Sequence, residues 1–299
     1  MKKGLLVVNG FINNSIVSRF NALYEMLVEA FKEYDYDLII KKNNELLIDI
    51  NNDYKDDYDF ILFWDKDISL AKHLENIGYK VFNSSKSIAI CDDKAKTYLV
   101  LENKNIKMPK TIIAPFTFSN NPYSDFSFVD NAIKELGLPF ILKECYGSFG
   151  KQVYLLNSKE KIIDKIKDVF PNSFLFQEYI ASSFGRDFRI EVVGGNAIGC
   201  VERRSNGKDF RSNVLQGGSM SKANPDESFI KMAEDACKII GLDFAGVDIM
   251  IGPKGEPILC EVNSNVHFKT FYKTTGINLA SFIAKYVINK ISEVPRWNF

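Results

Sequence analysis

The sequence predicts a mixed fold, α/β and α+β, that begins with a small parallel α/β domain. Over the first 86 residues, short apolar segments alternate with segments of helical periodicity, which is typical of parallel strands connected by helices. Further along, strands are expected on both sides of Gly194-Gly195 and of a glycine-containing turn at 252–256, as in antiparallel hairpins. We therefore expect an N-terminal α/β domain over 1–86, a central subdomain over 87–180 and a carboxy-terminal subdomain over 181–299.

The first unit is defined by the spacing of its apolar residues. Phe20, Leu23 and Leu27 recur at helical spacing, which predicts a helix over 16–34. Strands are expected at 5–8, 37–41, 59–64 and 80–82, and a second helix near 68–77. The Val-Asn-Gly segment after the first strand lacks the second and third glycines of a dinucleotide-binding fingerprint, so no such site is expected there.

The two later units are predicted to combine helices and strands. A single helix is expected over 87–103, and the stretch 115–130 is expected to be a surface loop because it is rich in serine, asparagine, proline and aromatic residues. In the central unit, strands are expected at 110–113, 140–143, 152–156 and 174–177, and helices at 129–136 and 158–168. In the last unit, strands are expected at 187–193, 197–204, 247–251 and 258–262, and helices at 226–240 and 277–291.

The composition describes an ordinary globular protein, with 46% hydrophobic and 25% charged residues among 299. The 38 basic and 38 acidic residues balance, so neither nucleic acid nor a membrane is an expected partner. Five cysteines without a Cys-x-x-Cys pair indicate neither a disulfide framework nor a zinc site, and a reducing cytoplasm fits best. Neither a signal-peptide core nor an apolar stretch of about 18 residues, enough to span a membrane, is present. His73 and His267 are the only histidines, which argues against Ser-His-Asp hydrolysis.

The segment 246–263 carries the most informative polar residues. Two apolar runs flank a Gly-Pro-Lys-Gly-Glu turn, which predicts a hairpin in which Gly252 faces Pro257 and Asp248 faces Glu261. Asn263 shares the face of Glu261 because side chains alternate along a strand. Three oxygen ligands on one patch of an apolar ladder suit Mg²⁺. An exposed hairpin face with scattered acids is the alternative interpretation.

A lysine leads into a glycine-containing loop between two expected strands. The segment reads Lys143-Glu144-Cys145-Tyr146-Gly147-Ser148-Phe149-Gly150-Lys151. Such a loop fits a phosphate-binding cradle, because glycines let backbone N–H groups approach anionic oxygens closely. Gln152 after Lys151 excludes the P-loop pattern. A flexible hairpin loop without a ligand is the alternative.

Two arginine-containing segments form a further candidate site for an anion. Glu202-Arg203-Arg204 is followed, after a short loop, by Asp209-Phe210-Arg211-Ser212-Asn213. Guanidinium groups from both sides of such a loop could bind a phosphoryl group or a carboxylate with forked hydrogen bonds, whereas a solvated charged loop is the alternative. For Lys94, which follows Asp92 and Asp93, an intrahelical salt bridge is the default interpretation.

Taken in order, these motifs resemble the ATP-grasp superfamily and, within it, the RimK-like branch of carboxylate-amine ligases. The resemblance extends from residue 87 to residue 288, and residues 1–86 match only as the small α/β domain that precedes the grasp. The matching motifs are Asp93-Lys94, Pro139-Phe140-Ile141-Leu142-Lys143, Gly147 with Gly150, Gln177-Glu178-Tyr179-Ile180, Asp187-Phe188-Arg189, Glu202-Arg203-Arg204, Asp209-Phe210-Arg211-Ser212-Asn213, Ala245-Gly246-Val247-Asp248, Glu261-Val262-Asn263 and Lys273-Thr274-Thr275-Gly276. The implied fold is an ATP-grasp fold with ATP between the central and carboxy-terminal subdomains.

The resemblance implies a role for each matching residue. The triphosphate would contact Lys94 and Lys143, with Gly147, Ser148 and Gly150 closing over it. The adenine-binding hinge would comprise Gln177, Glu178, Tyr179 and Ile180, and the nucleotide site would be completed by Asp187 near the ribose and by Arg189, Ser212 and Asn213. One or two Mg²⁺ or Mn²⁺ ions would be held by Asp248, Glu261 and Asn263. The implied catalytic residues are Arg203 and Arg211, which would steady the phosphoryl group and the acyl-phosphate.

The implied activity is ATP-dependent ligation of a glutamate type. A carboxylate becomes an electrophile when the γ-phosphoryl group of ATP is transferred to it, and an amine then attacks the acyl-phosphate, releasing phosphate. Positive charge near the oxyanion and closure of the glycine loop against water would assist. The implied partners are an amino acid and a carboxylate acceptor, which is a peptide, a carrier protein or a small metabolite. Dimers or tetramers are common in this branch, and the sequence does not decide the oligomeric state.

The chain departs from the family pattern after Asn263. It continues Ser264-Asn265-Val266-His267-Phe268-Lys269-Thr270-Phe271, whereas ribosomal-protein-modifying members have a Ser-Pro-Gly type of continuation. We expect this segment to line the substrate pocket and to set which amino acid is added. His267 either touches substrate there or makes a structural contact.

Two other functions remain open on the sequence. A D-alanine–D-alanine-like dipeptide ligase is disfavoured, because Gly246 stands where the catalytic arginine of that family is expected. A non-catalytic ATP-binding regulatory module is disfavoured by the intact set of Asp248, Glu261 and Asn263.

Overall fold

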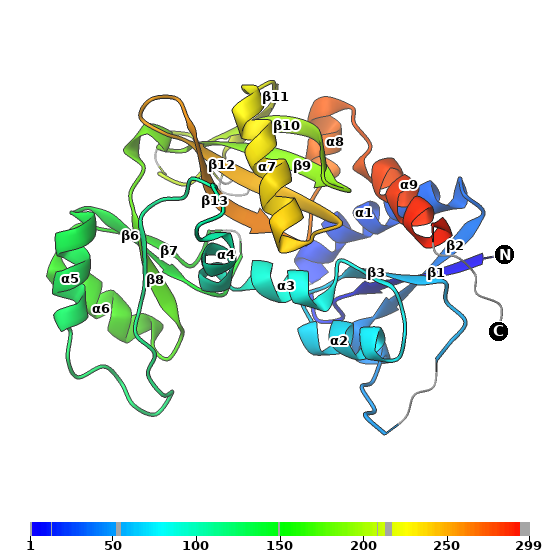
Figure 1. The fold of residues 1–299 in the computed structure, drawn as a ribbon, viewed down its shortest axis with the longest axis horizontal. Helices are drawn as coiled ribbons and strands as arrows, with labels where there is room; N and C mark the ends of the chain where they lie inside the picture. The colour runs from blue at the N-terminus through cyan, green and yellow to red at the C-terminus, as the bar shows by residue number, and fades with distance from the viewer. Residues whose placement is uncertain are drawn as a thin grey trace.

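The described residues form three β-sheets, each flanked by helices (Figure 1). The structure, a computed structural model, describes residues 2–12, 14–51, 55–148, 150–207, 209–212 and 217–293. Each sheet lies within one of the three expected units, whose boundaries at 86/87 and 180/181 stay a prediction. No helix in these described ranges is long and apolar enough to cross a membrane.

The first sheet is parallel, as the alternation of strands and helices predicts, with the strand order β2-β1-β3-β4. Alternate residues of its strands enter different cores, because side chains of a strand point to opposite faces. Leu6 and Val8 of β1 pack under α1, whereas Leu5 and Val7 pack on the side of α2. The elements are β1 (Lys2–Val8), α1 (Asn14–Lys32), β2 (Tyr36–Lys42), a 3₁₀ turn η1 (Asn43–Glu45), β3 (Phe60–Trp64), α2 (Ile68–Asn76) and β4 (Val81–Phe82).

The prediction of a single helix over 87–103 is wrong, because two helices meet at Asp93. These are α3 (Ser85–Asp92) and α4 (Lys94–Leu101). Asp93 has an extended backbone, with φ −106° and ψ 108°, and its carboxylate accepts hydrogen bonds from the N–H groups of Ala95 and Lys96. An aspartate that caps a new helix in this way ends the preceding one.

The second sheet has the order β5-β8-β6-β7 and forms a separate lobe with two helices on one face (Figure 1). Its apolar face, which includes Phe140, Leu142 and Phe176, packs against α5 and α6. Its other face carries Lys143, Leu175 and Gln177 by the same alternation. The elements are β5 (Thr111–Ile113), α5 (Ser127–Leu136), β6 (Phe140–Glu144), β7 (Val153–Leu156), α6 (Lys159–Val169) and β8 (Phe174–Glu178). The stretch expected as a loop thus gives way to helix at Ser127.

The third sheet is antiparallel, with the order β11-β10-β9-β12-β13. Helix α7 covers one face, where it packs on Ile190, Val247 and Leu259. The elements are η2 (Ala181–Ser183), β9 (Arg186–Val193), β10 (Asn196–Arg204), β11 (Ser219–Ala223), α7 (Glu227–Ile240), β12 (Phe244–Ile251), β13 (Pro257–Asn263), α8 (Lys269–Thr275) and α9 (Leu279–Ser292). The sequence did not predict β11 or α8. β11 is an edge strand of mostly small and polar residues, and α8 has only 7 residues.

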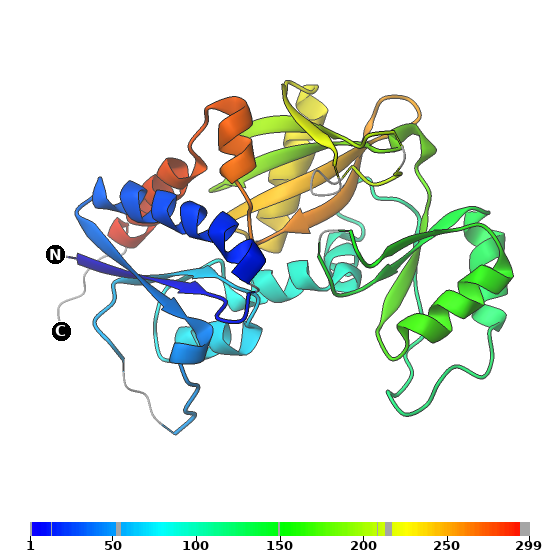
Figure 2. The ribbon, with the colours of Figure 1, turned by 180° about the vertical axis from the view of Figure 1, so that it is seen from behind.

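The last helix returns to the first sheet, where α9 packs against α1 (Figure 2). Leu279, Ile283 and Val287 of α9 share one core with Leu23 and Leu27 of α1. The first and third units are therefore joined by a continuous apolar core.

Asn83, which is completely buried, also connects the first unit to the third. Its amide donates to the carbonyl oxygens of Phe244 and Ser264, and its Oδ1 accepts from the N–H groups of Asp243 and Phe244 at 2.7 and 3.2 Å. We expect Asn83→Ala to lower the free energy of unfolding by about 3 kcal/mol or more, because several buried backbone groups lose their partners at once. Urea titration would measure this.

The matched control is Asn196→Ala, because Asn196 is exposed and its side chain makes one hydrogen bond, to the carbonyl oxygen of Gly194. We expect a change within about 0.5 kcal/mol for the control. Equal losses for the two variants would contradict the role given to Asn83.

Asp243 should make the stability depend on pH in an unusual direction. Burial raises the pKa of its carboxyl group to about 6, and the hydroxyl of Tyr286 donates to it at 2.8 Å. Between pH 4 and 6 the folded protein therefore holds a proton that the unfolded chain has released, so the free energy of unfolding falls as the pH rises. We expect Asp243 to lower the free energy of unfolding by about 3 kcal/mol over this pH range, and Asp243→Asn to abolish that contribution. Urea unfolding at pH 4, 5, 6 and 7 would measure it. Parallel pH profiles for Asp243→Asn and wild type would contradict the assignment. Asp235→Asn serves as the control, because the side chain of Asp235 is 40% exposed.

Candidate active site

One face of the third sheet is charged, on the side opposite α7. In β9, β12 and β13, polar residues and Gly246 on this side alternate with apolar residues such as Ile190, Val247 and Val262, which pack under α7. The strand register places Arg189 opposite Asp248 and Arg203 opposite Asp187. The charged residues of this face are Asp187, Arg189, Glu191, Arg203, Asp248 and Glu261.

The predicted pairing of Asp248 with Glu261 is confirmed, but the predicted pairing of the turn is wrong. Ile251, not Gly252, faces Pro257. A β-bulge between Asp248 and Ile249 then shifts the register by one residue and brings Asp248 opposite Glu261. Asn263 lies beside them, with its Nδ2 3.5 Å from Oδ2 of Asp248. The three predicted metal ligands are therefore neighbours.

The structure shows that Asp248 is already paired with two arginines. Nη1 of Arg189 lies 2.9 Å from Oδ1 of Asp248, and Nη2 of Arg203 lies 3.1 Å from Oδ2. The carboxylate is only 6% exposed, and burial alone would raise its pKa. The two guanidinium groups outweigh this and hold the pKa of Asp248 below its usual value. Asp248 is thus ionised and charge-compensated.

Arg203 also links Asp248 to Asp187. It binds Asp187 through two hydrogen bonds, at 2.8 Å from Nε and 2.6 Å from Nη2, and Ser212 donates its hydroxyl to the same carboxylate. Sequence reasoning assigned Arg203 to the phosphoryl group, Asp187 to the ribose and Ser212 to the nucleotide. The structure joins all three in one network.

Arg189 occupies the space above Gly246. A Cβ atom at Gly246 would lie 2.0 Å from Nη2 of Arg189, so the glycine makes room for the guanidinium group. Nε of Arg189 lies 3.2 Å from Glu191, whose pKa is raised by burial. An arginine is therefore present at this place, although it comes from β9 and not from position 246. The absence of an arginine at 246 no longer argues against a D-alanine–D-alanine-like ligase.

The predicted phosphate side of the site comprises Lys143, Lys94 and the glycine loop. Lys143 is 7% exposed, and its Nζ lies 4.0 Å from Sγ of Cys260, the residue before Glu261. Lys94 donates to the carbonyl oxygen of Gly147 at 3.2 Å, so the intrahelical salt bridge interpretation is wrong for this lysine. Lys96 is instead the partner of Asp93, at 3.6 Å.

A lysine that sequence reasoning missed completes this side. Nζ of Lys66, which follows β3, lies 2.5 Å from Asp92 and 3.4 Å from Oγ of Ser148. Lys66 therefore connects the first sheet to the glycine loop. No local signal marked it, because its partner Ser148 lies 82 residues further along the chain.

The second arginine segment contacts the glycine loop, and the predicted hinge residues lie at and just after the end of β8. Arg211 donates to the carbonyl oxygen of Gly150 at 2.6 Å and pairs with Asp209 at 2.7 Å. Gln177 is buried and donates to Thr111, whereas Glu178 is exposed and accepts from the N–H of Lys110. Tyr179 packs edge-on against Phe210, and Ile180 is buried. Asn213, predicted to contact the nucleotide, lies outside the described residues.

The donor set on the charged face fits a hard cation. Within the described ranges, no hydrogen bond or ion pair engages the carboxylate of Glu261, while Asp248 is balanced by arginines. No cluster of three His, Cys, Asp or Glu side chains that could hold a metal is found in the same ranges, and the predicted set contains only two carboxylates plus Asn263. Two carboxylates and an amide suit Mg²⁺, which usually keeps waters and substrate oxygens as its remaining ligands.

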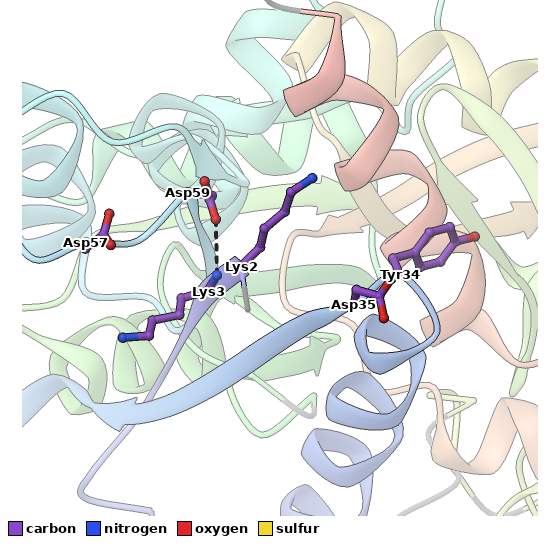
Figure 3. Close-up of a pocket in the computed structure, with 6 residues that line it drawn as sticks. All are labelled: Lys2, Lys3, Tyr34, Asp35, Asp57 and Asp59. Carbon is purple, nitrogen blue, oxygen red and sulfur yellow. Dashed lines mark hydrogen bonds between the residues drawn. The ribbon is translucent and has the colours of Figure 1, made fainter.

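A cavity of about 630 Å³ lies far from these residues, at the amino ends of strands β1 and β3 (Figure 3). Six residues line it: Lys2, Lys3, Tyr34, Asp35, Asp57 and Asp59. The N–H of Lys3 donates to Asp59 there at 3.1 Å. Ligands of α/β sheets bind at the carboxyl ends of the strands, whereas this cavity lies at their amino ends.

Comparisons with known proteins identify the family and the fold. The family model for the RimK-like ATP-grasp domain matches residues 91–287. The chain is 33% identical over 228 residues to N-acetylaspartylglutamate synthase A of Homo sapiens, a match that covers 75% of this chain and 56% of that protein. A probable alpha-L-glutamate ligase of Legionella pneumophila is 32% identical, with 76% of this chain and 72% of that protein covered. The chain thus spans little more than half the length of the human relative.

Solved structures show the same fold. A RimK domain ATP-grasp protein of Sphaerobacter thermophilus superposes with a TM-score of 0.71 at 17% identity, covering 95% of this chain and 99% of that one. D-alanine–D-alanine ligase of Bacillus anthracis gives a TM-score of 0.73 at 17% identity, covering 98% of each chain. The fold is therefore the predicted ATP-grasp fold. With the family model matched over 91–287, this chain belongs to the RimK-like ATP-grasp family.

Proposed function

We propose that this protein is an ATP-dependent ligase that activates a carboxylate as an acyl-phosphate and couples it to the amine of an amino acid. The proposal rests on the contact between Lys143 and Cys260 of β13. A buried lysine from the second sheet reaches Cys260, next to the carboxylate of Glu261 on the third sheet. A cationic group for phosphates and an anionic group for a metal therefore lie side by side between two sheets, as phosphoryl transfer requires.

The proposed role of each residue follows from its charge. Lys94, Lys143 and the Gly147–Gly150 loop would bind the triphosphate, and Asp248, Glu261 and Asn263 would hold Mg²⁺. The metal ion would neutralise negative charge on the β- and γ-phosphate oxygens. Arg211 binds the loop at the carbonyl oxygen of Gly150, so it can keep the loop closed over the acyl-phosphate and exclude water. Arg203 can stabilise the oxyanion once it is released from Asp248.

The relatives supply a first panel of substrates. Their names contain N-acetylaspartylglutamate, beta-citrylglutamate and alpha-L-glutamate. We therefore propose glutamate as the first amine to test, with N-acetylaspartate, citrate and peptides as carboxylate acceptors. Purified protein with ATP and Mg²⁺ should release ADP and phosphate only when an amine and an acceptor are both present. Failure to bind ATP at all would overturn the proposal.

A D-alanine–D-alanine-like ligase is the second candidate, favoured by Arg189 above Gly246. In that case free amino acids alone would support the release of ADP. A non-catalytic ATP-binding module would bind ATP without any amine-dependent turnover.

A further inference from the structure

A polar group of residues lies where the parallel strands β1 and β3 end. Asn9 follows β1 and Asp65 follows β3. The carboxylate of Asp65 is 5% exposed and accepts hydrogen bonds from Nδ2 of Asn9 at 3.1 and 3.3 Å and from the N–H of Lys66 at 2.6 Å. The loop after β1 is held in turn, because the N–H of Gly10 donates to Asn43. Ligands of α/β sheets bind at this edge.

The carboxylate of Asp65 has only uncharged donors in the described part of the chain. The ammonium group of Lys66 pairs with Asp92, so only its longer-range charge acts on Asp65. Burial raises the pKa of Asp65. Burial also raises the pKa of the neighbouring Tyr24 hydroxyl, and the negative charge of Asp65 raises that pKa further. A buried carboxylate without an ion pair in the described residues is costly, and a bound cation would offset this cost.

Both chain neighbours of Asp65 contact segments that the proposed function places at the active site. The carbonyl oxygen of Trp64 accepts from Nδ2 of Asn265, two residues beyond the proposed ligand Asn263. The amide oxygen Oδ1 of Asn265 is buried and, within the described ranges, has no hydrogen-bond partner. On the other side, Lys66 reaches Ser148 of the glycine loop. Asp65 therefore lies between the segment 264–271, expected to line the substrate pocket, and the loop proposed to close over the acyl-phosphate.

We propose that Asp65 binds the ammonium group of the amine substrate. This inference rests on the proposed ligase function and names the group that positions its nucleophile. One proton of the ammonium passes to the carboxylate of Asp65, which leaves a neutral amine. Its nitrogen lone pair forms the C–N bond while the bond from the acyl carbon to the phosphate oxygen breaks, and the departing phosphate takes the second proton.

Asp65→Asn tests this assignment, because it keeps the shape of the side chain and removes its charge. We expect KM for glutamate to rise at least tenfold, which corresponds to the loss of about one charge-assisted hydrogen bond, while KM for ATP stays unchanged. Hydroxylamine, an amine that is largely uncharged at neutral pH, should still be converted to a hydroxamate by the variant at the wild-type rate. A residue that only fixed the end of a strand would not separate the two amines.

The control is Asp59→Asn, at the amino edge of the same sheet, where Asp59 accepts a hydrogen bond from the N–H of Lys3 (Figure 3). We expect wild-type kinetics for this control. The assignment of Asp65 is overturned if the two variants have the same KM for glutamate, or if Asp65→Asn loses the hydroxylamine reaction as well. If the wild type releases no ADP with either amine, the proposed ligase function itself fails, and the inference falls with it.

Discussion

Alanine in place of Asp248 is expected to lower ATP-dependent turnover by at least about a hundredfold, because the proposed metal loses a carboxylate and Arg203 loses an orienting partner. It should also lower the free energy of unfolding by about 3 kcal/mol, since two buried guanidinium groups lose a partner. This cost lies at the low end for a buried ion pair, because Arg203 keeps Asp187 and Arg189 keeps Glu191. Turnover is measured as ADP release, and stability by urea titration.

Glu261→Gln separates the loss of activity from the loss of stability. Glu261 has no ion pair in the described ranges, so its replacement should change the free energy of unfolding by less than about 0.5 kcal/mol. Turnover should fall as steeply as in Asp248→Ala. An Asp248→Ala protein with unchanged activity would instead favour the non-catalytic ATP-binding module.

Local sequence patterns predicted most of the elements, and they failed where one residue altered the geometry. The hairpin of β12 and β13 was predicted from its apolar runs and its turn. The β-bulge was not, because nothing in an apolar run marks an extra residue, so the turn pairing was wrong while Asp248 still faced Glu261. The single helix predicted over 87–103 was wrong at Asp93, because an aspartate within a helical pattern can either continue the helix or cap a new one.

The candidate site was predicted as a set of residues but not as a network. Asp248, Glu261 and Asn263 were placed together because they share one hairpin. The pairing of Asp248 with Arg189 depends on the alignment of β12 with β9, which lie about 60 residues apart along the chain, and no local pattern fixes such an alignment. Asp65 and Lys66 were missed for the same reason, because their surroundings come from distant segments.

The contact between Arg203 and Asp248 leads to a prediction with two opposite effects. In Arg203→Met, Asp248 loses one of its two cationic partners and its carboxylate becomes more available to a metal. Without nucleotide, we expect free Mn²⁺ to bind at least tenfold more tightly than in wild type, because less positive charge opposes it. With substrates, we expect turnover to fall by at least about a hundredfold, because the cation proposed to stabilise the oxyanion is gone.

Mn²⁺ binding can be followed by electron paramagnetic resonance, which needs no turnover. Arg204→Met is the matched control, because Arg204 is the next residue of β10, is half-exposed and pairs with Glu202 rather than with Asp248. Wild-type values are expected for both measurements in this control. Unchanged Mn²⁺ affinity in Arg203→Met would mean that Arg203 does not compete with the metal for Asp248. A rise in Mn²⁺ affinity together with the loss of turnover would show that Arg203 neutralises Asp248 at the proposed metal site until Mg²⁺ binds with ATP.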